Sequence, residues 1–339
     1  MLKNTLTSVN TLYELIALSE VSCKSMRFKT MAKIIGPGSL NVDITGYVPR
    51  LPKDGETAVG TALRITPGGK GNNQMTAAHR AGAEVYIIAC RGSDVIGKTL
   101  EEFYKGEGMS EKYLTVSDTC ETGSALIEID GESAQNRIIV VPGANKCVSK
   151  ENVLAAEVDF AYCDAVLSQF ETTVGAAVAA KELAKKYKKP FILNPAPYIE
   201  VPTSFFSGID YITPNETETK ELTGVAVSTI DDCRAAAREL LNMGVKNVII
   251  TRGVNGVFYT DGKTEITVPA IKVKAKETTG AGDAFNGAFA TAIAEGKPIK
   301  YALEFATCAA AISVTRLGSC QSMPSRAEIL ELMQKHFGE

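Results

Sequence analysis

The sequence predicts a three-layer αβα domain around a doubly wound, mainly parallel sheet, with a small β-sheet lid inserted into it. From residue 150 onward, candidate strands alternate with candidate helices, which is typical of a parallel sheet covered by helices on both faces. The strands are 164–168, 190–194, 209–213 and 247–251, and the helices are 172–187, 216–223 and 231–243. The segments near 42–66 and 122–141 alternate like strands but carry no helix, so we expect them to form the lid.

The remaining elements follow in chain order. A first strand is expected at 33–39, a helix after Gly71, a strand at 85–89 and a helix at 97–106. Within the lid, Asp130-Gly131 predicts a hairpin turn between 122–130 and 136–141. Two β-segments, 256–260 and 264–269, precede helices at 281–295, 299–314 and 325–336. Residues 33–339 are therefore expected to form one domain, preceded by an extension of unknown role at 1–32.

Composition excludes several classes of protein. The 339 residues are 45% apolar and carry a net charge of -3, which favours a large core and gives no sign of a nucleic-acid or membrane partner. No apolar run approaches the roughly 20 residues that span a bilayer. The eight cysteines form no C-x-x-C pair and there are two histidines, so neither zinc nor a disulfide framework is indicated. We expect a cytoplasmic protein whose general base, if it has one, is a carboxylate.

Residues 92–99 fit the phosphate-loop pattern G-x-x-x-x-G-K-S/T in full. Two observations argue against a true phosphate loop there. A lid and another α/β unit already precede it, and no later apolar strand ends in a clear magnesium-binding aspartate. We interpret Gly92 and Gly97 as turn residues and Lys98 as a solvated helix residue.

A second glycine-rich turn, at 277–285, is the stronger candidate for phosphate chemistry. Gly280 and Gly282 flank Ala281 just before a long apolar helix. Unpaired N–H groups and the helix dipole make such a start an anion site, and glycine allows close approach. Asp283 lies in the first helical turn, where it could cap the helix or accept a hydroxyl proton beside a bound phosphate.

Further polar residues cluster where predicted strands end, which is the edge at which open parallel sheets bind ligands. They are Asn41-Val42-Asp43, Gly68-Gly69-Lys70, Gln169-Phe170-Glu171, Asn194-Pro195-Ala196, Asn215-Glu216-Thr217-Glu218 and Thr251-Arg252-Gly253.

These motifs resemble those of the ribokinase family (pfkB type) of carbohydrate kinases. The likeness covers about residues 33–335, and its specific parts are 68–74 (Gly-Gly-Lys-Gly-Asn-Asn-Gln), 278–285 and, between them, 215–218. The family also has a G-x-D-x-x-G loop where residues 92–97 stand, which explains the phosphate-loop pattern as a coincidence. The resemblance implies the ribokinase-like fold.

The resemblance also implies roles for matching positions. Sugar-binding positions match Asn41, Asp43, Gly69, Lys70, Asn73 and Glu171, and the catalytic base matches Asp283, with Gly280, Ala281 and Gly282 forming the anion hole. Asn215 and Glu218 match the motif that organises Mg²⁺, and Asn215, Thr251, Gly253, Gly256, Gly282 and Thr307 fall with the ATP-binding positions. A potassium site matches Glu277, Thr279, Ser313, Arg316, Gly318 and Ser322. The family has Asp where Glu277 stands, and the extra methylene moves the carboxylate roughly 1.5 Å, which puts activation by K⁺ in doubt.

By this resemblance the expected activity is ATP-dependent phosphorylation of a small sugar at its primary hydroxyl. The favoured reaction is that of D-ribose to D-ribose 5-phosphate. Kinases of deoxyribose, fructose or adenosine are alternatives within the fold, and a non-catalytic sugar-binding sensor is the alternative outside catalysis. A homodimer formed through the lid is also implied, since a lone β-ribbon exposes apolar faces and edges.

Overall fold

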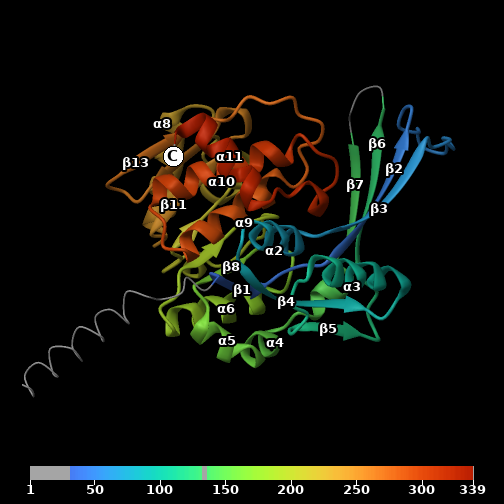
Figure 1. Ribbon diagram of the computed structural model, residues 1–339, viewed down its shortest axis with the longest axis horizontal. Coiled ribbons are helices and arrows are strands. Elements are labelled where there is room, and N and C mark those ends of the chain that lie inside the picture. Colours follow the sequence, from blue (N-terminus) through green and yellow to red (C-terminus); the bar gives the residue numbers. More distant parts are fainter. Residues whose placement is uncertain (1–30, 132–135, 339) are drawn as a thin grey trace, which may run out of the picture. The chain divides into compact units, whose positions relative to one another are not determined.

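The computed structural model describes residues 31–131 and 136–338. Residues 32–339 form one compact unit (Figure 1). The predicted extension lies almost entirely outside the described residues. Within the described part of the chain, no helix is long and apolar enough to cross a bilayer.

The main sheet confirms the predicted doubly wound architecture. Its nine described strands have the order β13-β12-β11-β10-β9-β8-β1-β4-β5. The seven strands from β11 to β5 run parallel, and β12 and β13 add an antiparallel edge. Their bounds are β1 Lys33–Pro37, β4 Glu84–Gly92, β5 Leu114–Ser117, β8 Ala165–Ser168, β9 Phe191–Leu193, β10 Tyr211–Ile212, β11 Asn247–Thr251, β12 Val257–Thr260 and β13 Glu265–Val268.

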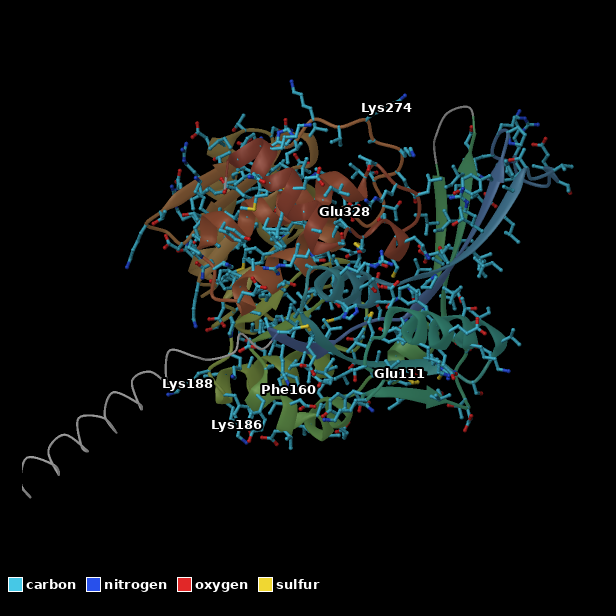
Figure 2. The ribbon with its side chains drawn as sticks, in the orientation of Figure 1. Glu111, Phe160, Lys186, Lys188, Lys274 and Glu328 are labelled. Carbon is cyan, nitrogen blue, oxygen red and sulfur yellow. The ribbon has the colours of Figure 1, made fainter. Side chains whose placement is uncertain are left out.

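Helices cover both faces of this sheet, because successive strand residues point to opposite sides. Ile34 of β1 packs into one apolar cluster and its neighbour Ile35 into the other. The first cluster joins the sheet to α2 (Lys70–Arg80), α3 (Val95–Glu107), α9 (Ala281–Ala294), α10 (Ile299–Ser313) and α11 (Arg326–Phe337). The second joins it to α4 (Lys150–Ala155), α5 (Glu157–Tyr162), α6 (Val174–Lys186), α7 (Glu216–Thr223) and α8 (Ile230–Asn242). Phe160 of α5, labelled in Figure 2, is fully buried in this second cluster.

A second, four-stranded sheet projects beside the main one, and we call it the lid sheet (Figure 1). Its order is β3-β2-β6-β7, with bounds β2 Asn41–Val48, β3 Ala62–Gly68, β6 Gly123–Asp130 and β7 Asn136–Val141. Strands β2 and β6 pair in parallel, and each pairs antiparallel with its outer neighbour. The predicted insertion of a small β-sheet is thus confirmed.

The loop at residues 92–99, which fits the phosphate-loop pattern, is filled by the side chain of Asp94. Asp94 caps α3 by accepting a hydrogen bond from Gly97 N at 2.7 Å. The same carboxylate accepts hydrogen bonds from the backbone N and the hydroxyl of Thr122, both at 2.7 Å. Lys98 is exposed. The loop is therefore a structural junction between α3 and the start of β6.

The structure adds three elements that the sequence did not predict: β5, α4 and α5. Strand β5 has four residues at the edge of the sheet, and none of them is buried. Helices α4 and α5 have six residues each and follow one another around Ala156. Periodicity cannot identify segments this short, because they contain less than two full turns or pleats.

Candidate active site

The polar residues at the strand ends meet where α2 and α9 begin. Asn41 and Asp43 open β2, Lys70 opens α2, and Asp283 lies in the first turn of α9. The two helices approach closely because position 287 of α9 is a glycine. A Cβ atom on Gly287 would lie 2.3 Å from the carbonyl oxygen of Gln74 on α2. This contact holds the N-terminal parts of α2 and α9 against each other.

Asp283 is held by two amides from the start of α2. Its side chain is 7% exposed. Asn73 Nδ2 donates to one carboxylate oxygen and Gln74 Nε2 to the other, both at 2.9 Å. Burial raises the pKa of Asp283, while the charge of Lys70 and these two hydrogen bonds oppose the rise. The carboxylate is therefore oriented from both sides and more basic than an exposed aspartate.

Gln74 belongs to a buried chain of amides behind Asp283. Its Oε1 accepts a hydrogen bond from Gln169 Nε2 at 2.6 Å, and its Nε2 also donates to Asn194 Oδ1 at 3.0 Å. Asn194 in turn donates to the carbonyl oxygen of Thr213 at 3.1 Å. These residues follow β8, β9 and β10, so the ends of three parallel strands fix the orientation of one amide. The sequence placed Gln169 and Asn194 at strand ends but assigned neither them nor Gln74 to the site.

Lys70 lies among carboxylates. Burial disfavours its charged form, yet the pKa of Lys70 lies above its ordinary value because three carboxylates offset that effect. They are Asp283, Glu171 and Glu218. Glu171 is itself fixed, since its Oε2 accepts from the backbone N of Lys70 at 2.9 Å and from Ser39 Oγ at 2.5 Å. The turn at the start of α2 is thus tied to the loop after β8.

Asp43 is buried on the face of the lid sheet that meets the main domain. Thr66 of β3 faces Asp43, and the carboxylate reaches past it to Gly68, where a Cβ atom would lie 2.3 Å from Asp43 Oδ2. Burial raises the pKa of Asp43 to about 6, although Ser319 Oγ donates to Oδ2 at 3.2 Å and opposes the shift. The charges of Glu171, Asp283 and Glu277 add to the rise.

A cavity of about 100 Å³ lies beside Asp43, between the lid sheet and two C-terminal loops. It is lined by Asp43, Thr45, Tyr47, Arg64, Thr66, Ile127, Glu277, Thr279, Leu317, Gly318, Ser319 and Gln321.

The start of α9 has the features of an anion site. Gly280 precedes the helix in the left-handed conformation, with φ 81°, and no described side chain caps the helix there. A Cβ atom on Gly282 would meet open space. The backbone N of Ala281 donates to Thr278 O at 3.2 Å. N–H groups in the first turn of a helix have no acceptor within the helix, so those of Gly282 and Asp283 are the ones that can bind an anion here.

The predicted magnesium and nucleotide residues lie along neighbouring strand ends. Asn215 caps α7 in a capping box with Glu218. Burial raises the pKa of Glu218 and Asp283 adds to the rise, while Lys70 lowers it, so Glu218 faces the same centre. Asn215 bridges in parallel to Thr251 at the end of β11.

Three further predicted nucleotide residues differ in what they offer a ligand. Gly253 is exposed and opens the turn after β11. At Gly256 a Cβ atom would lie 2.1 Å from the carbonyl oxygen of Val268. Thr307 is buried within α10, and its hydroxyl donates to Leu303 O at 2.8 Å. Gly253 is therefore accessible, whereas the hydroxyl of Thr307 is already bonded within its own helix.

The predicted potassium residues lie on two adjoining loops. Glu277 reaches across from one to the other, and its Oε2 accepts from Gly318 N at 3.0 Å. Ser313 and Ser322 each donate their hydroxyl to a nearby carbonyl, at 2.8 and 2.7 Å. The Arg316 side chain points elsewhere, forming an ion pair with Glu328 of α11, labelled in Figure 2. Hence Arg316 could serve such a site only through its backbone.

Comparisons with known proteins agree with this geometry. A family model described as pfkB family carbohydrate kinase matches residues 31–326. The chain is 41% identical over 298 residues to ribokinase from Haemophilus influenzae, an alignment that covers 88% of this chain and 97% of that protein. It is 35% identical over 297 residues to deoxyribokinase from Salmonella typhi, covering 87% of this chain and 97% of that protein.

A solved structure of Arabidopsis thaliana ribokinase complexed with ribose and ATP is similar in fold, with a TM-score of 0.84 and 31% sequence identity. The likeness covers 90% of this chain and 99% of that chain. The chain belongs to the pfkB family of carbohydrate kinases.

Proposed function

We propose that this kinase transfers the γ-phosphoryl group of ATP to the primary hydroxyl of D-ribose, giving D-ribose 5-phosphate and ADP. The observation that carries the proposal is the position of Asp283, a buried carboxylate held by Asn73 and Gln74 beside the open start of α9. The relative from Haemophilus influenzae is named ribokinase, and the Arabidopsis thaliana structure holds ribose and ATP. Both support ribose as the first substrate to test.

Sugar hydroxyls would bind between the lid sheet and the start of α2. We assign this role to Asn41, Asp43, Gly69, Lys70, Asn73 and Glu171. Carboxylates accept hydrogen bonds from hydroxyls, whereas amides and ammonium groups donate to them, so this set can hold several hydroxyls at once. The lid sheet covers the sugar and excludes water, which limits hydrolysis of ATP.

Asp283 acts as the general base. It takes the proton of the primary hydroxyl as that oxygen forms its bond to the γ-phosphorus, and the bond from the γ-phosphorus to the leaving ADP oxygen breaks. Burial makes Asp283 more basic, and the two amide donors keep its ionised form oriented. The proton then passes to solvent when the products leave. N–H groups at Gly280–Asp283 stabilise the negative charge of the group in transfer.

Mg²⁺ fits the residues beside this centre. A magnesium ion usually keeps several waters and binds to one or two carboxylates and to substrate phosphates, so it needs no closed protein cage. Glu218, half-buried and facing Asp283, offers such a carboxylate, and Asn215 fixes its position. When bound, the ion supplies charge neutralisation on the phosphates. The nucleotide would lie along Thr251, Gly253 and Gly256, in line with Asn215.

K⁺ fits the donor chemistry of the two loops that Glu277 joins. Alkali cations bind to carbonyl and carboxylate oxygens, and these loops carry Thr279, Ser313, Gly318 and Ser322 as well as Glu277. One oxygen of Glu277 is already bonded to Gly318 N. We therefore propose that K⁺ is an activator whose binding here is weakened by the longer side chain.

The outer face of the lid sheet supports a homodimer. One row of apolar residues crosses all four strands, since register places Ile65 opposite Ile44, Ile44 opposite Leu126 and Leu126 opposite Ile139. Ile65, Leu126 and Ile139 are 54%, 44% and 63% exposed. An apolar sheet face of this kind needs a cover, and a second copy of the same face is complementary to it.

Release of ADP tests the proposed function. Purified protein with ATP and Mg²⁺ should release ADP in the presence of D-ribose, and much more slowly with fructose or adenosine. Asp283→Asn keeps the size of the side chain but removes the base, so it should lower kcat by orders of magnitude while sugar binding persists. Near-normal turnover by this variant would overturn the assignment of the base.

Deoxyribose is the second candidate, because the relative from Salmonella typhi is named deoxyribokinase. The two sugars differ by one hydroxyl, and a site built to bond a hydroxyl rejects the analogue that lacks it. Comparing kcat/KM for the two sugars therefore decides between them. Sugar-independent release of ADP, unchanged by either sugar, would contradict both.

A further inference from the structure

Two cysteines lie in contact at the base of the lid sheet. Cys120 precedes β6 by three residues, and Cys147 ends the short 3-10 helix Gly143–Cys147 that follows β7. Their Sγ atoms are 3.2 Å apart, and Cys147 donates its S–H to Cys120. Both side chains are partly exposed, whereas the other described cysteines are all buried. Nothing in the kinase chemistry above uses this pair.

The surroundings of Cys120 favour its thiolate. The hydrogen bond from Cys147, followed by those from Ser117 and Thr119, lowers the pKa of Cys120, while the pKa of Cys147 is raised. Cys120 lies in a polar turn in which its own backbone N donates to Ser117 Oγ at 3.0 Å. A thiolate is the reactive form in thiol–disulfide exchange, so Cys120 is the first nucleophile of the pair.

The pair lies next to the strand that opens the proposed sugar site. Between Cys147 and β7, the buried Asn145 donates to Asn41 Oδ1 at 2.7 Å and accepts from Leu40 N at 2.7 Å. Its neighbour Ala144 donates from its backbone N to Glu121 O at 2.8 Å, beside Cys120. The chain entering β6 and the chain leaving β7 are therefore joined here, and both are joined to Asn41.

We propose that Cys120 and Cys147 are a redox modification site that forms a reversible disulfide by exchange with a small-molecule disulfide. The Cys120 thiolate attacks one sulfur of the oxidant, a mixed disulfide forms and one small thiol leaves. Cys147 then loses its proton and attacks the Cys120 sulfur, which forms the Cys120–Cys147 bond and releases the second small thiol. The two protein thiols lose two electrons and two protons, and the oxidant gains both. The sulfurs must approach from 3.2 Å to about 2.0 Å, a change that side-chain rotation can supply.

The disulfide would bind the two ends of the β6–β7 hairpin to each other. This consequence rests on the proposed function, because it concerns closure of the lid sheet over a sugar. With the disulfide in place, the backbone around Asn145 and Asn41 cannot adjust when the lid sheet closes. The oxidised enzyme should therefore bind sugar more weakly. Formation of the disulfide itself does not depend on the substrate.

Peptide mapping tests the disulfide. The full chain carrying Cys23→Ser, which removes the cysteine outside the described residues, is incubated with oxidised glutathione, alkylated and digested. We expect one cross-linked peptide pair through Cys120 and Cys147, lighter than the two reduced peptides by two hydrogen atoms, and its loss after dithiothreitol. Cys147→Ser should instead retain a glutathione adduct on Cys120. An adduct that persists on Cys120 with Cys147 present, no reaction at Cys120, or pairing with another cysteine would overturn the proposal.

Kinetics test the effect on the lid sheet separately. Oxidised protein should show a several-fold rise in KM for ribose that dithiothreitol reverses. Cys147→Ser forms the glutathione adduct but no cross-link, so its KM should not show this rise. A cross-link that forms without any change in KM would overturn the coupling to the lid sheet but not the disulfide. If no sugar is phosphorylated by the reduced protein, the proposed function fails, while the mapping still decides the disulfide.

Discussion

Replacing Asp43 with asparagine should stabilise the folded protein at neutral pH. Asp43 is 8% exposed, and burial raises its pKa from the ordinary 3.8 to about 6. The folded state thus disfavours the ionised carboxylate, by about 3 kcal/mol when this displacement is converted to free energy. The substituted amide would have nearly the same shape, carry no charge, and still offer an acceptor to Ser319 Oγ. Asp43→Asn should therefore raise the free energy of unfolding, by up to about 3 kcal/mol.

The pH dependence gives this prediction its sign. Because the folded-state pKa is the higher one, the folded protein binds the proton of Asp43 more readily than the unfolded chain does. The destabilisation caused by ionised Asp43 is therefore absent below about pH 3.8. It grows as the pH rises from there to about 6 and is fully present above that pH. The advantage of Asp43→Asn should be complete at pH 8 and largely lost at pH 4.

Urea denaturation at both pH values measures the effect. The midpoint of Asp43→Asn should exceed that of the unsubstituted protein at pH 8, with an unchanged slope, and approach it at pH 4. Asp54→Asn is the matched control, because Asp54 is exposed in a lid-sheet loop and its replacement should change neither midpoint. A loss of stability at pH 8, or a gain that is equally large at pH 4, would refute the burial cost assigned to Asp43.

Function should change in the opposite direction. An ionised carboxylate accepts stronger hydrogen bonds from sugar hydroxyls than an amide oxygen does, by about 1.5–3 kcal/mol. Asp43→Asn should therefore lower kcat/KM for ribose by about 10–100-fold while the protein becomes more stable. Buried charge retained at such a cost is characteristic of functional sites.

Three other substitutions test the surroundings of the site. Gln74→Leu removes the 2.9 Å hydrogen bond to Asp283, so it should raise the pKa of Asp283, shift the acidic limb of the kcat–pH profile upward, and lower kcat by about 10-fold or more. Glu277→Asp withdraws the carboxylate from Gly318 N, so the ratio of kcat in K⁺ to kcat in Na⁺ should increase. Ile139→Asp places a charge on the outer face of the lid sheet and should convert the proposed homodimer to monomer in light scattering.

Each of these has a result that contradicts it. An unshifted pH profile for Gln74→Leu, with kcat reduced, would mean that Gln74 acts only on packing. Equal rates in K⁺ and Na⁺ for Glu277→Asp would remove the case for a cation between the two loops. Val116→Asp, at an apolar strand residue outside the lid sheet that is 51% exposed, is the control for Ile139→Asp. A monomer in the unsubstituted protein, or dissociation by the control, would refute the proposed interface.

Much of the fold was predictable because the apolar residues of its long helices and strands recur with a clear period. The alternation after residue 150 predicted the parallel sheet, and the non-helical segments at 42–66 and 122–141 predicted the lid sheet. The candidate site was predicted in three ways: the strand-end rule collected polar runs, the glycine-rich turn before α9 singled out Asp283, and the resemblance implied the roles of these residues. Asn41, Lys70, Asn215 and Asp283 are far apart in sequence, yet each begins or ends an element at the same edge of the sheet.

What the sequence could not supply depends on distances between elements. The contact of Cys120 with Cys147 arises because β6 and β7 form a hairpin whose two ends meet, and a spacing of 27 residues carries no such signal. The pKa values of Asp43 and Asp283 depend on burial by segments far along the chain. The role of Gln74 was equally hidden in the sequence, since its amide partners Gln169 and Asn194 follow two different strands.

The start of α2 connects the proposed sugar site to the proposed base. Lys70, Asn73 and Gln74 lie within five consecutive residues, and of these Asn73 and Gln74 orient Asp283 while Lys70 offsets its charge. The backbone N of Lys70 also donates a hydrogen bond to Glu171, so the proposed sugar site and the proposed base share one support. A small displacement of this segment must therefore change sugar affinity and the basicity of Asp283 together. Substitutions that alter only one of the two should lie outside the segment, as Asp43 and Glu277 do.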